Sequence, residues 1–341
     1  MSERLCSVGL DVGTTSTQLI VSELVVENRA SAFAVPELEI AQREIRYKSP
    51  VYFTPLLDES HVDGEKIREI VQEEYRKAGL QRQDVDTGAI IITGETSRKE
   101  NARAVLDALA DFAGEFVVAT AGPDLESVLA AKGAGAVAFS EQEGKTVLHM
   151  DIGGGTSNLA LIRKGQIVNT GCLNVGGRLV KFGEDGVVSY VSPVLSGLCN
   201  LKVGDRVTQE DLEPVAQLLT QALEMAAGLR DKTELLDKLT TAEAAGGFSP
   251  PQEPVVLSFS GGVADCIDNP PPDWLAFGDL GVLLGLAIAA SPAFQKAGRF
   301  RGAETIRATV VGAGSHSTDL SGSTIFYRDI PFPLKSIPIL K

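Results

Sequence analysis

Histidine and cysteine, the residues that most often hold zinc, are scarce in this chain of 341 residues. It has three histidines and four cysteines, and Cys6, Cys172, Cys199 and Cys266 lie far apart with no C-x-x-C pair. A structural zinc site needs four closely spaced ligands, and no histidine lies near a cysteine pair, so the pattern argues against one. Unpaired cysteines at such spacings favour a reduced, cytosolic protein.

An excess of positive charge is also missing. Lys and Arg total 31 against 45 Asp and Glu, which gives a formal net charge of −14 at pH 7. Because nucleic acids and anionic membranes are held by basic patches, this balance disfavours both as partners. It does not exclude a nucleotide, which backbone N–H groups and a metal ion hold locally. The most apolar stretch, 280–290, is too short to span a bilayer and is typical of a buried helix.

Two short stretches stand out, because each has an aspartate followed by glycines and hydroxyl residues. Residues 10–17 read LDVGTTST, and residues 150–157 read MDIGGGTS. A strand-like run precedes and follows each stretch, which predicts a hairpin with Asp11 or Asp151 at the end of its first strand. The tip of such a hairpin presents backbone N–H groups and hydroxyls to an anion. The two hairpins therefore predict two related domains that face one phosphate chain.

The residue types in these stretches fit a phosphate and magnesium site. Asp11 and Asp151 are placed to hold a hydrated Mg²⁺ against phosphate oxygens. Glycine lets the backbone approach a phosphate closely, and threonine supplies a hydroxyl donor. The candidate nucleotide-binding residues here are Gly13, Thr14, Thr15, Thr17, Gly153, Gly154, Gly155 and Thr156. A structural turn with a solvated aspartate is the alternative, and the repetition of the pattern favours function.

Strand-like and helix-like segments alternate along the chain, which is typical of an α/β fold with the sheet between helices. Helices are predicted over 63–79, 97–112, 126–139, 208–229 and 279–290, and strands over 89–92, 116–118, 166–173 and 255–259. Residues 24–62, with Pro36, Pro50 and Pro55, are predicted to be irregular, with short strands and loops. The pattern restarts at residue 144, so the architecture is duplicated. We predict domains over 1–143 and 144–295, and a C-terminal segment from 296–341 with strands over 308–311 and 324–327.

A third glycine turn follows the strand predicted over 255–259. Gly261 and Gly262 would form a flat surface for a purine and its ribose, with Asp265 in the same motif. An ordinary strand-to-helix turn is the alternative, and residues 312–315 compete for the same role. We rank 261–265 first because an apolar helix follows it.

Two predicted helices rich in small residues, 126–139 and 279–290, fit a close crossing between domains, where a hinge would lie. Two unrelated core helices would explain the composition equally well. Glu126 opens the first helix and is a candidate to reach the cleft. A glutamate at a helix start also suits the surface, because it interacts favourably with the helix dipole.

These elements follow one another as in the actin/Hsp70/sugar-kinase ATPase superfamily, which the chain resembles over residues 5–291. The first phosphate turn matches 10–17, the first connecting helix 126–139, the second phosphate turn 150–157, the adenosine turn 256–265 and the second connecting helix 278–291. The resemblance implies duplicated ribonuclease-H-like domains around a nucleotide cleft, with ATP or ADP and Mg²⁺ as cofactors. Because Hsp70-type chaperones carry a cleft glutamate at the position of Glu126, it joins Asp11 and Asp151 as a candidate catalytic residue.

Within that superfamily the chain resembles the ethanolamine ammonia-lyase reactivating factor (EutA) family. The likeness is carried by residues 8–17, 92–101, 150–158, 259–266 and 312–317, which read VGLDVGTTST, ITGETSRKEN, MDIGGGTSN, FSGGVADC and GAGSHS. Matches spread along the whole chain are more specific than the superfamily turns. The family extends further at its C-terminus, so the resemblance implies that this chain is truncated there.

The resemblance implies a chaperone-like ATPase that acts on a protein. When ethanolamine ammonia-lyase, an adenosylcobalamin enzyme, holds damaged cobalamin, such a factor uses ATP and Mg²⁺ to release it so that intact coenzyme binds. The expected partners are this lyase and a nucleotide, in the cytoplasm. Association with the ethanolamine bacterial microcompartment, or with further copies of the chain, stays open.

Two other functions stay open from the sequence alone. A small-molecule kinase of the same superfamily would need an acceptor site with a catalytic carboxylate near the γ-phosphate, and no separate polar cluster clearly supplies one. An actin-like filament protein would need self-complementary surfaces, which a sequence does not reveal.

Overall fold

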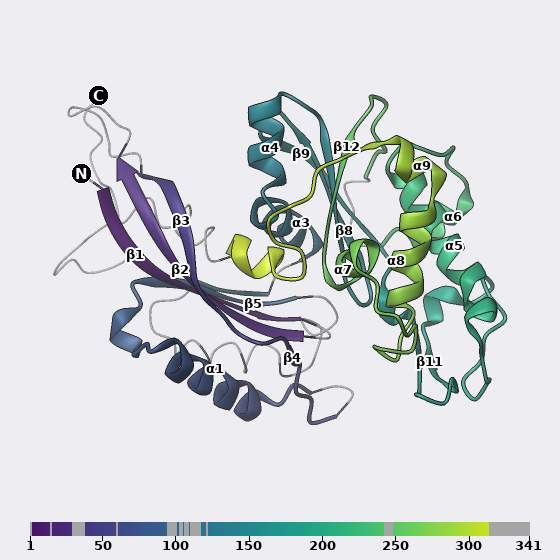
Figure 1. Ribbon diagram of the computed structural model, residues 1–341, viewed down its shortest axis with the longest axis horizontal. Helices are drawn as coiled ribbons and strands as arrows, with labels where there is room; N and C mark the ends of the chain where they lie inside the picture. The colour runs from purple at the N-terminus through teal and green to yellow at the C-terminus, as the bar shows by residue number, and fades with distance from the viewer. Residues whose placement is uncertain are drawn as a thin grey trace, which may run out of the picture.

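Two mixed β-sheets, one from each half of the chain, lie side by side in the computed structural model (Figure 1). The structure describes residues 2–13, 16–28, 38–58, 61–93, 101, 105, 109, 117–120, 122–241 and 248–313. No helix among these residues is long and apolar enough to cross a membrane.

The first sheet has the strand order β3-β2-β1-β5-β6, and β4 pairs with the beginning of β2. β1, β2 and β3 are antiparallel neighbours, whereas β1, β5 and β6 are parallel. β5 is an almost continuous buried apolar run, as expected for an interior parallel strand. The strands are β1 (Ser2–Val12), β2 (Ser16–Asn28), β3 (Leu38–Lys48), β4 (Tyr52–Phe53), β5 (Thr87–Ile92) and β6 (Val117–Thr120).

The second sheet repeats this order as β9-β8-β7-β12-β13, again with three antiparallel strands followed by two parallel ones. The duplication predicted from the sequence is therefore confirmed in the strand order. β13 pairs with β12 and so extends this sheet beyond residue 295, where the predicted second domain ends. The strands are β7 (Val147–Ile152), β8 (Ser157–Arg163), β9 (Gln166–Leu173), β12 (Val256–Ser260) and β13 (Gly298–Arg299).

Helix α1 (Gly64–Ala78) covers one face of the first sheet, below it in Figure 1. Its buried side chains Ile67 and Val71 pack with Leu10 in one hydrophobic cluster. The Asp63 side chain accepts the Lys66 N–H at the start of the helix. The helix ends at Gly79, which has a left-handed φ of +69°. A 3₁₀ turn, η1 (Arg82–Asp84), leads to β5.

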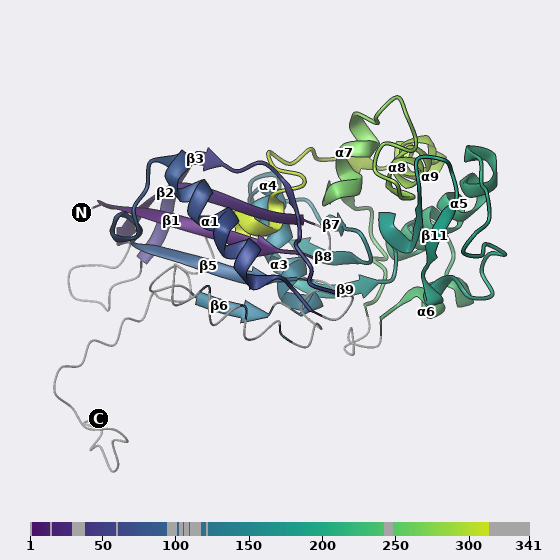
Figure 2. The same ribbon diagram turned by 90° about the horizontal axis from the view of Figure 1, so that it is seen from below.

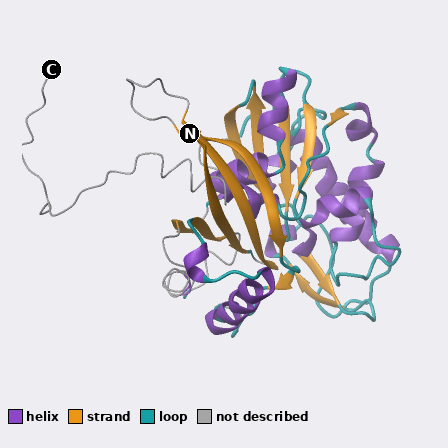
Figure 3. Ribbon diagram, turned by 60° about the vertical axis from the view of Figure 1, so that its left-hand side comes forward, coloured by secondary structure: helices purple, strands orange, loops and turns teal. Residues whose placement is uncertain are grey.

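The remaining elements of the second half surround its sheet, as Figure 3 shows in purple and orange. Helices α5, α7 and α8 contribute to its large hydrophobic cluster. Thr208 and Asp211 form a capping box at the start of α5, which begins where the sequence predicts the helix over 208–229. The elements are η3 (Gly177–Leu179), β10 (Val180–Phe182), β11 (Val188–Val191), η4 (Pro193–Leu195), α5 (Gln209–Ala226), α6 (Glu234–Leu239), α7 (Gly262–Asp268), α8 (Gly281–Ala290) and α9 (Pro292–Lys296).

The helix predicted over 126–139 is two helices, α3 (Pro123–Gly133) and α4 (Ala136–Glu143). The prediction of one helix is wrong because Gly135, at φ +79°, reverses the backbone between them. Both helices follow β6 of the first sheet, and α3 packs against β7, β8 and β9 of the second. The chain therefore passes from one half to the other through α3.

A short helix over 308–313 lies between the two sheets, in yellow in Figures 1 and 2. The strand predicted over 308–311 is therefore wrong. Val310 and Val311, which suggested a strand, are buried with Ile20 of β2. Tertiary burial on the first sheet thus overrides their local preference for a strand.

This helix crosses α3 with almost no space between the two backbones. A Cβ on Gly133 would lie 1.8 Å from the Ala308 carbonyl oxygen, and a Cβ on Gly312 would lie 2.0 Å from the Leu129 carbonyl oxygen. Only glycine fits at these two positions. The crossing predicted between 126–139 and 279–290 is wrong, because α8 packs on α5 and α7 instead.

The prediction of irregular structure over 24–62 is also wrong in part, because β2 continues to Asn28 and β3 covers Leu38–Lys48. Pro50 and Pro55 lie outside these strands, so they did not prevent the long hairpin. Other predictions lie outside the described residues: Thr14 and Thr15, most of the helix over 97–112, residues 314 and 315 of the competing turn, and the strand over 324–327.

Candidate functional site

A cavity of about 360 Å³ lies where the two halves meet. Its size falls in the range of roughly 300–1,000 Å³ that is typical of small-molecule sites. Both aspartate–glycine turns, the start of α3 and the turn after β12 line it together. The predicted site residues that line it are Asp11, Gly13, Glu126, Asp151, Gly153, Gly154, Gly155, Thr156, Gly261 and Gly262.

The two aspartate–glycine turns are closed by the same hydrogen bond. The Gly13 N–H donates to the Ser16 carbonyl at 2.9 Å, and the Gly153 N–H donates to the Thr156 carbonyl at 2.9 Å. The first N–H group of each turn thus holds the turn together, and the later groups are the candidates for a phosphate. Ser16 lines the cavity although the sequence did not single it out.

A second backbone segment supports the turn after β7. The Gly177 N–H donates to the Gly153 carbonyl at 3.0 Å, and the Arg178 N–H donates to the Gly154 carbonyl at 2.6 Å. A Cβ on Gly176 would lie 2.3 Å from the Gly154 carbonyl oxygen, so glycine permits this approach. With its carbonyl groups held from behind, the turn keeps a fixed shape at the cavity.

Among the described residues four carboxyl groups line the cavity, and three of them, Asp11, Glu126 and Asp151, come from β1, α3 and β7. Asp11, only 8% exposed at the end of β1, accepts the Thr93 hydroxyl at 3.0 Å. Burial raises its pKa to about 8, against the Thr93 hydrogen bond, and the negative charges of Glu126 and Asp151 raise it further. Burial also raises the pKa of Asp151, which accepts the Ser260 hydroxyl at 2.5 Å. These carboxyl groups therefore repel one another at close quarters.

Glu126 is buried at the beginning of α3. The alternative, a glutamate on the surface at a helix start, is therefore not observed. Its Oε2 atom accepts the Asn158 side-chain amide at 2.8 Å. Asn158 lies on β8 of the second sheet and itself lines the cavity. This hydrogen bond joins a carboxylate at the end of the first half to the second sheet, and no local pattern in the sequence predicts it.

The charges around the cavity fit a divalent cation that is shared with phosphate oxygens. Arg178 is the one basic side chain among the described lining residues, and its Nε atom lies 3.4 Å from Asp279 Oδ2. Nowhere in the described part of the chain do three or more carboxyl, histidine or cysteine groups form a metal site by themselves. Mg²⁺ usually takes one or two protein carboxylates and completes its shell with water and phosphate. Asp11 and Asp151 match that demand.

The turn after β12 has the backbone that a flat nucleoside platform requires. Gly261 has φ +86°, and a Cβ there would lie 2.3 Å from the Ile152 carbonyl oxygen. Asp265 does not line the cavity; its carboxylate accepts the Thr305 hydroxyl at 2.5 Å. The Thr305 carbonyl in turn accepts the Gly261 N–H at 3.2 Å. Asp265 therefore supports the turn from outside the cavity.

Thr17 likewise lies behind the first turn. It is fully buried, and its hydroxyl oxygen is 3.2 Å from that of Thr54, which donates to the Gly13 carbonyl at 2.7 Å. Like Asp265, it is a predicted site residue that the structure places beside the cavity rather than in its lining.

The mouth of the cavity is formed by a segment that the sequence suggested was irregular. Val51, Tyr52 and Phe53 line the cavity, and Phe53 is 78% exposed. The Arg178 guanidinium lies 5.7 Å from the centre of the Phe53 ring and so reaches this segment from the second half. An aromatic rim thus faces the entrance.

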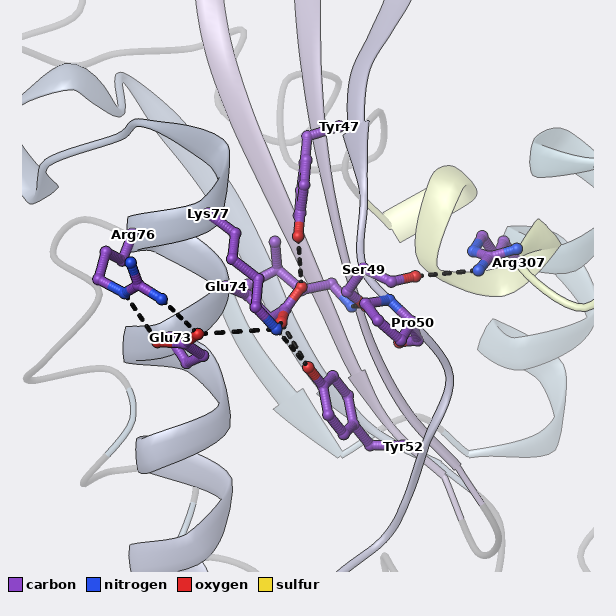
Figure 4. Close-up of polar contacts among 10 residues, drawn as sticks. Tyr47, Ser49, Pro50, Tyr52, Glu73, Glu74, Arg76, Lys77 and Arg307 are labelled. Carbon is purple, nitrogen blue, oxygen red and sulfur yellow. Dashed lines mark hydrogen bonds and ion pairs between the residues drawn. The ribbon is translucent and has the colours of Figure 1, made fainter.

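A polar network holds this segment in place (Figure 4). The fully buried Glu74 carboxylate of α1 accepts the Tyr47 hydroxyl at 2.7 Å, the Lys77 ammonium at 2.8 Å and the Tyr52 hydroxyl. Burial raises the pKa of Glu74, but these hydrogen bonds outweigh it and the pKa is lowered. The rim is therefore fixed to a helix of the first half.

The segment 305–309 contacts the cavity from the C-terminal side and was missed entirely at the level of sequence. The Ile306 carbonyl accepts the Gln18 side-chain amide at 3.2 Å, and the Thr309 hydroxyl lies 3.4 Å from Asp151 Oδ2.

Comparisons with known proteins agree with this architecture. The sequence matches the family described as ethanolamine utilisation protein EutA over residues 3–341. It is 41% identical over 340 residues to the ethanolamine ammonia-lyase reactivase EutA of Salmonella typhimurium strain LT2. It is 40% identical over 341 residues to the protein of the same name from Escherichia coli strain K12. Each alignment covers 99% of this chain and 73% of the relative.

A solved structure supports the fold. The Ppx/GppA family member of Aquifex aeolicus superposes with a TM-score of 0.51 at 14% identity, covering 93% of this chain and 98% of that chain. At this identity the likeness concerns the fold alone. The two repeated sheets around a shared cavity are the actin/Hsp70 ATPase fold.

Proposed function

We propose, because this chain belongs to the ethanolamine utilisation protein EutA family, that it reactivates ethanolamine ammonia-lyase as a chaperone-like ATPase. The observation that carries the proposal is the 41% identity, over 99% of the chain, to a relative named as a reactivase of that lyase. In this function ATP and Mg²⁺ drive the release of damaged cobalamin from the lyase, so that intact coenzyme binds in its place.

The proposed nucleotide position is the cavity between the halves. Asp11 and Asp151 would hold Mg²⁺ through water, and the N–H groups of Gly154 and Gly155 would face the phosphates. Bound Mg²⁺ would neutralise the charge that develops on the phosphates as the bond to the leaving group breaks. Gly261 and Gly262 would lie under the adenosine.

Glu126 is the residue we assign to the attacking water. Its carboxylate is buried, lines the cavity and is held by Asn158, so it keeps one orientation without help from a ligand. A carboxylate fixed in this way would accept a hydrogen bond from the water and align it with the phosphate. Little other covalent chemistry is required of the protein.

Hydrolysis would act on the lyase by changing how the halves sit around the cavity. Both sheets contribute lining residues, so a nucleotide bound there would contact both halves, and its products would make a different set of contacts. Such a difference shifts the population between more open and more closed forms, which is how ligand chemistry reaches a protein surface. The surface that contacts the lyase would follow this movement.

One assay tests the function directly. Ethanolamine ammonia-lyase loaded with hydroxocobalamin is mixed with the full-length protein, ATP, Mg²⁺ and fresh adenosylcobalamin, and deamination of ethanolamine is followed. We expect recovery with the wild type and with Asp231→Asn, an exposed control, and none without ATP or with Asp151→Asn. No recovery with the wild type would overturn the assignment of the lyase. Phosphorylation of an added polyol would favour the kinase instead.

A further inference from the structure

A buried histidine, His149, is linked to Asp151 by a chain of hydrogen bonds that lies behind the cavity rather than in its lining. His149 on β7 is fully buried and lies between two serines of β12: its Nδ1 atom is 3.0 Å from Ser258 Oγ and its Nε2 atom is 2.9 Å from Ser260 Oγ. Ser260 donates its hydroxyl to Asp151 Oδ1 at 2.5 Å. The described lining of the cavity includes Asp151 but neither His149 nor Ser260.

The strand register explains why these four side chains meet. β7 and β12 are parallel neighbours in which His149 pairs with Ser258 and Asp151 pairs with Ser260. Residues two apart on a strand point to the same face of the sheet. The four side chains therefore form one array on one face, which runs from the sheet interior to the cavity.

The direction of each hydrogen bond follows from the donors and acceptors available. An ionised Asp151 only accepts, so the single hydroxyl hydrogen of Ser260 is committed to it. Ser260 must then accept from His149, which places the imidazole hydrogen on Nε2 and leaves Nδ1 to accept from Ser258. His149 is fully buried, and both of its ring nitrogens face serine hydroxyls rather than a carboxylate, so the ring is neutral and has one N–H to donate.

We propose that His149 and Ser260 are positioning residues that fix Asp151: the Nε2–H tautomer of His149 orients the Ser260 hydroxyl, and that hydroxyl holds Oδ1 of Asp151. The remaining oxygen, Oδ2, is then the one that faces Thr309 and the cavity. This role rests on the proposed function, because it matters only if Asp151 serves a bound cation and phosphate. Groups that orient a metal-binding carboxylate commonly change metal affinity or activity by about 10- to 100-fold when they are removed.

The tautomer is tested without any turnover. In protein labelled with ¹⁵N-histidine, long-range ¹H–¹⁵N spectra distinguish the two neutral tautomers, and His61→Gln and His316→Gln assign the other two signals. We expect His149 to show the Nε2–H form in the wild type and to lose that preference in Ser260→Ala. An Nδ1–H form in the wild type would overturn the proposal, whether or not the protein hydrolyses ATP.

The positioning role is tested by comparing buried serines. We expect Ser260→Ala to raise the Mg²⁺ concentration needed for half-maximal ATP turnover by about 10- to 100-fold. Ser258→Ala should raise it less. Ser140→Ala is the matched control, because Ser140 is equally buried but donates to the Lys145 carbonyl. If Ser260→Ala behaves like Ser140→Ala while the wild type turns over ATP, the positioning role is wrong and the ATPase assignment stands. If the wild type has no turnover, the ATPase assignment fails and the tautomer spectra decide the hydrogen-bond chain.

Discussion

Replacing Asp11 with asparagine should stabilise the nucleotide-free protein while removing its response to magnesium and ATP. Asp11 is 8% exposed, and in the cavity it faces the carboxyl groups of Glu126 and Asp151. Burial raises its pKa from 3.8 to about 8, although the Thr93 hydrogen bond opposes the shift. An asparagine keeps the oxygen that accepts from Thr93 and has no charge to bury.

The size of this effect follows from proton linkage. Because the folded pKa is raised, the protein takes up a proton on folding between pH 3.8 and 8, and its stability falls as the pH rises through that window. The raised pKa of Asp11 lowers the free energy of unfolding by about 2 kcal/mol at pH 5 and by about 4 kcal/mol at pH 7. Well above pH 8 this loss no longer grows. Asp11→Asn should recover most of this free energy, with the gain largest at alkaline pH.

Urea unfolding at pH 5, 7 and 9 without nucleotide measures the effect. The difference in free energy of unfolding between Asp11→Asn and the wild type should grow as the pH rises. For Asp231→Asn, an exposed control, this difference should stay constant with pH. In the presence of Mg²⁺ and ATP the melting temperature should rise for the wild type and stay unchanged for Asp11→Asn. If the free energy of unfolding changed with pH equally in both proteins, or if Asp11→Asn were less stable than the wild type at pH 9, the argument that the buried charge of Asp11 costs stability would be refuted.

Three further changes separate chemistry from architecture. Glu126→Gln should slow single-turnover ATP hydrolysis at least about 100-fold with little change in fluorescent-nucleotide affinity, because the glutamine oxygen still accepts from Asn158 of β8 but glutamine is a poorer base. Gly133→Ala should lower the free energy of unfolding by about 1–3 kcal/mol, since its Cβ would lie 1.8 Å from a carbonyl oxygen, whereas Gly122→Ala, with open space around it, should not. Glu74→Ala should lower the free energy of unfolding in urea by about 1–3 kcal/mol, because it leaves the half-buried Tyr47 and Tyr52 hydroxyls without their acceptor, whereas Glu73→Gln, at its less buried neighbour, should cost less than about 0.5 kcal/mol.

The two hairpins and their turns were predictable because everything that specifies them lies within a few consecutive residues. An apolar run, an aspartate, glycines and a second apolar run define each hairpin locally, and the repeat at 150–157 confirmed the pattern of 10–17. The capping box at Thr208 was predictable for the same reason. Elements of this kind need no knowledge of what packs on them.

The helix over 308–313 was not predictable from its own residues. Val310 and Val311 favour a strand locally, and only their burial against Ile20 of the other half selects the helix. The choice of crossing partner was not predictable either. The composition of α3 does not show whether it crosses the helix over 308–313 or the glycine- and alanine-rich α8. Contacts between distant segments decide both cases.

The site divides in the same way. Asp11 and Asp151 were found because the glycines beside them mark a turn that approaches a ligand. Thr93, Asn158 and Ser260, which hold the three carboxylates, were not found, because each reaches its partner only through contacts between elements distant in sequence. A motif search thus finds the residues that would face the ligand more readily than those that orient them.

The segment 305–309 decides how the halves are able to move. It contacts Asp265 and Asp151 in the second half, and Gln18 and Ser49 in the first, by hydrogen bonds that include Arg307 to the Ser49 carbonyl at 2.9 Å (Figure 4). Separating the halves must break one of these two sets. The adjoining glycine crossing has no free space for sliding, because a single Cβ would already overlap a carbonyl. We therefore expect opening to be a rotation about this crossing rather than a slide along it.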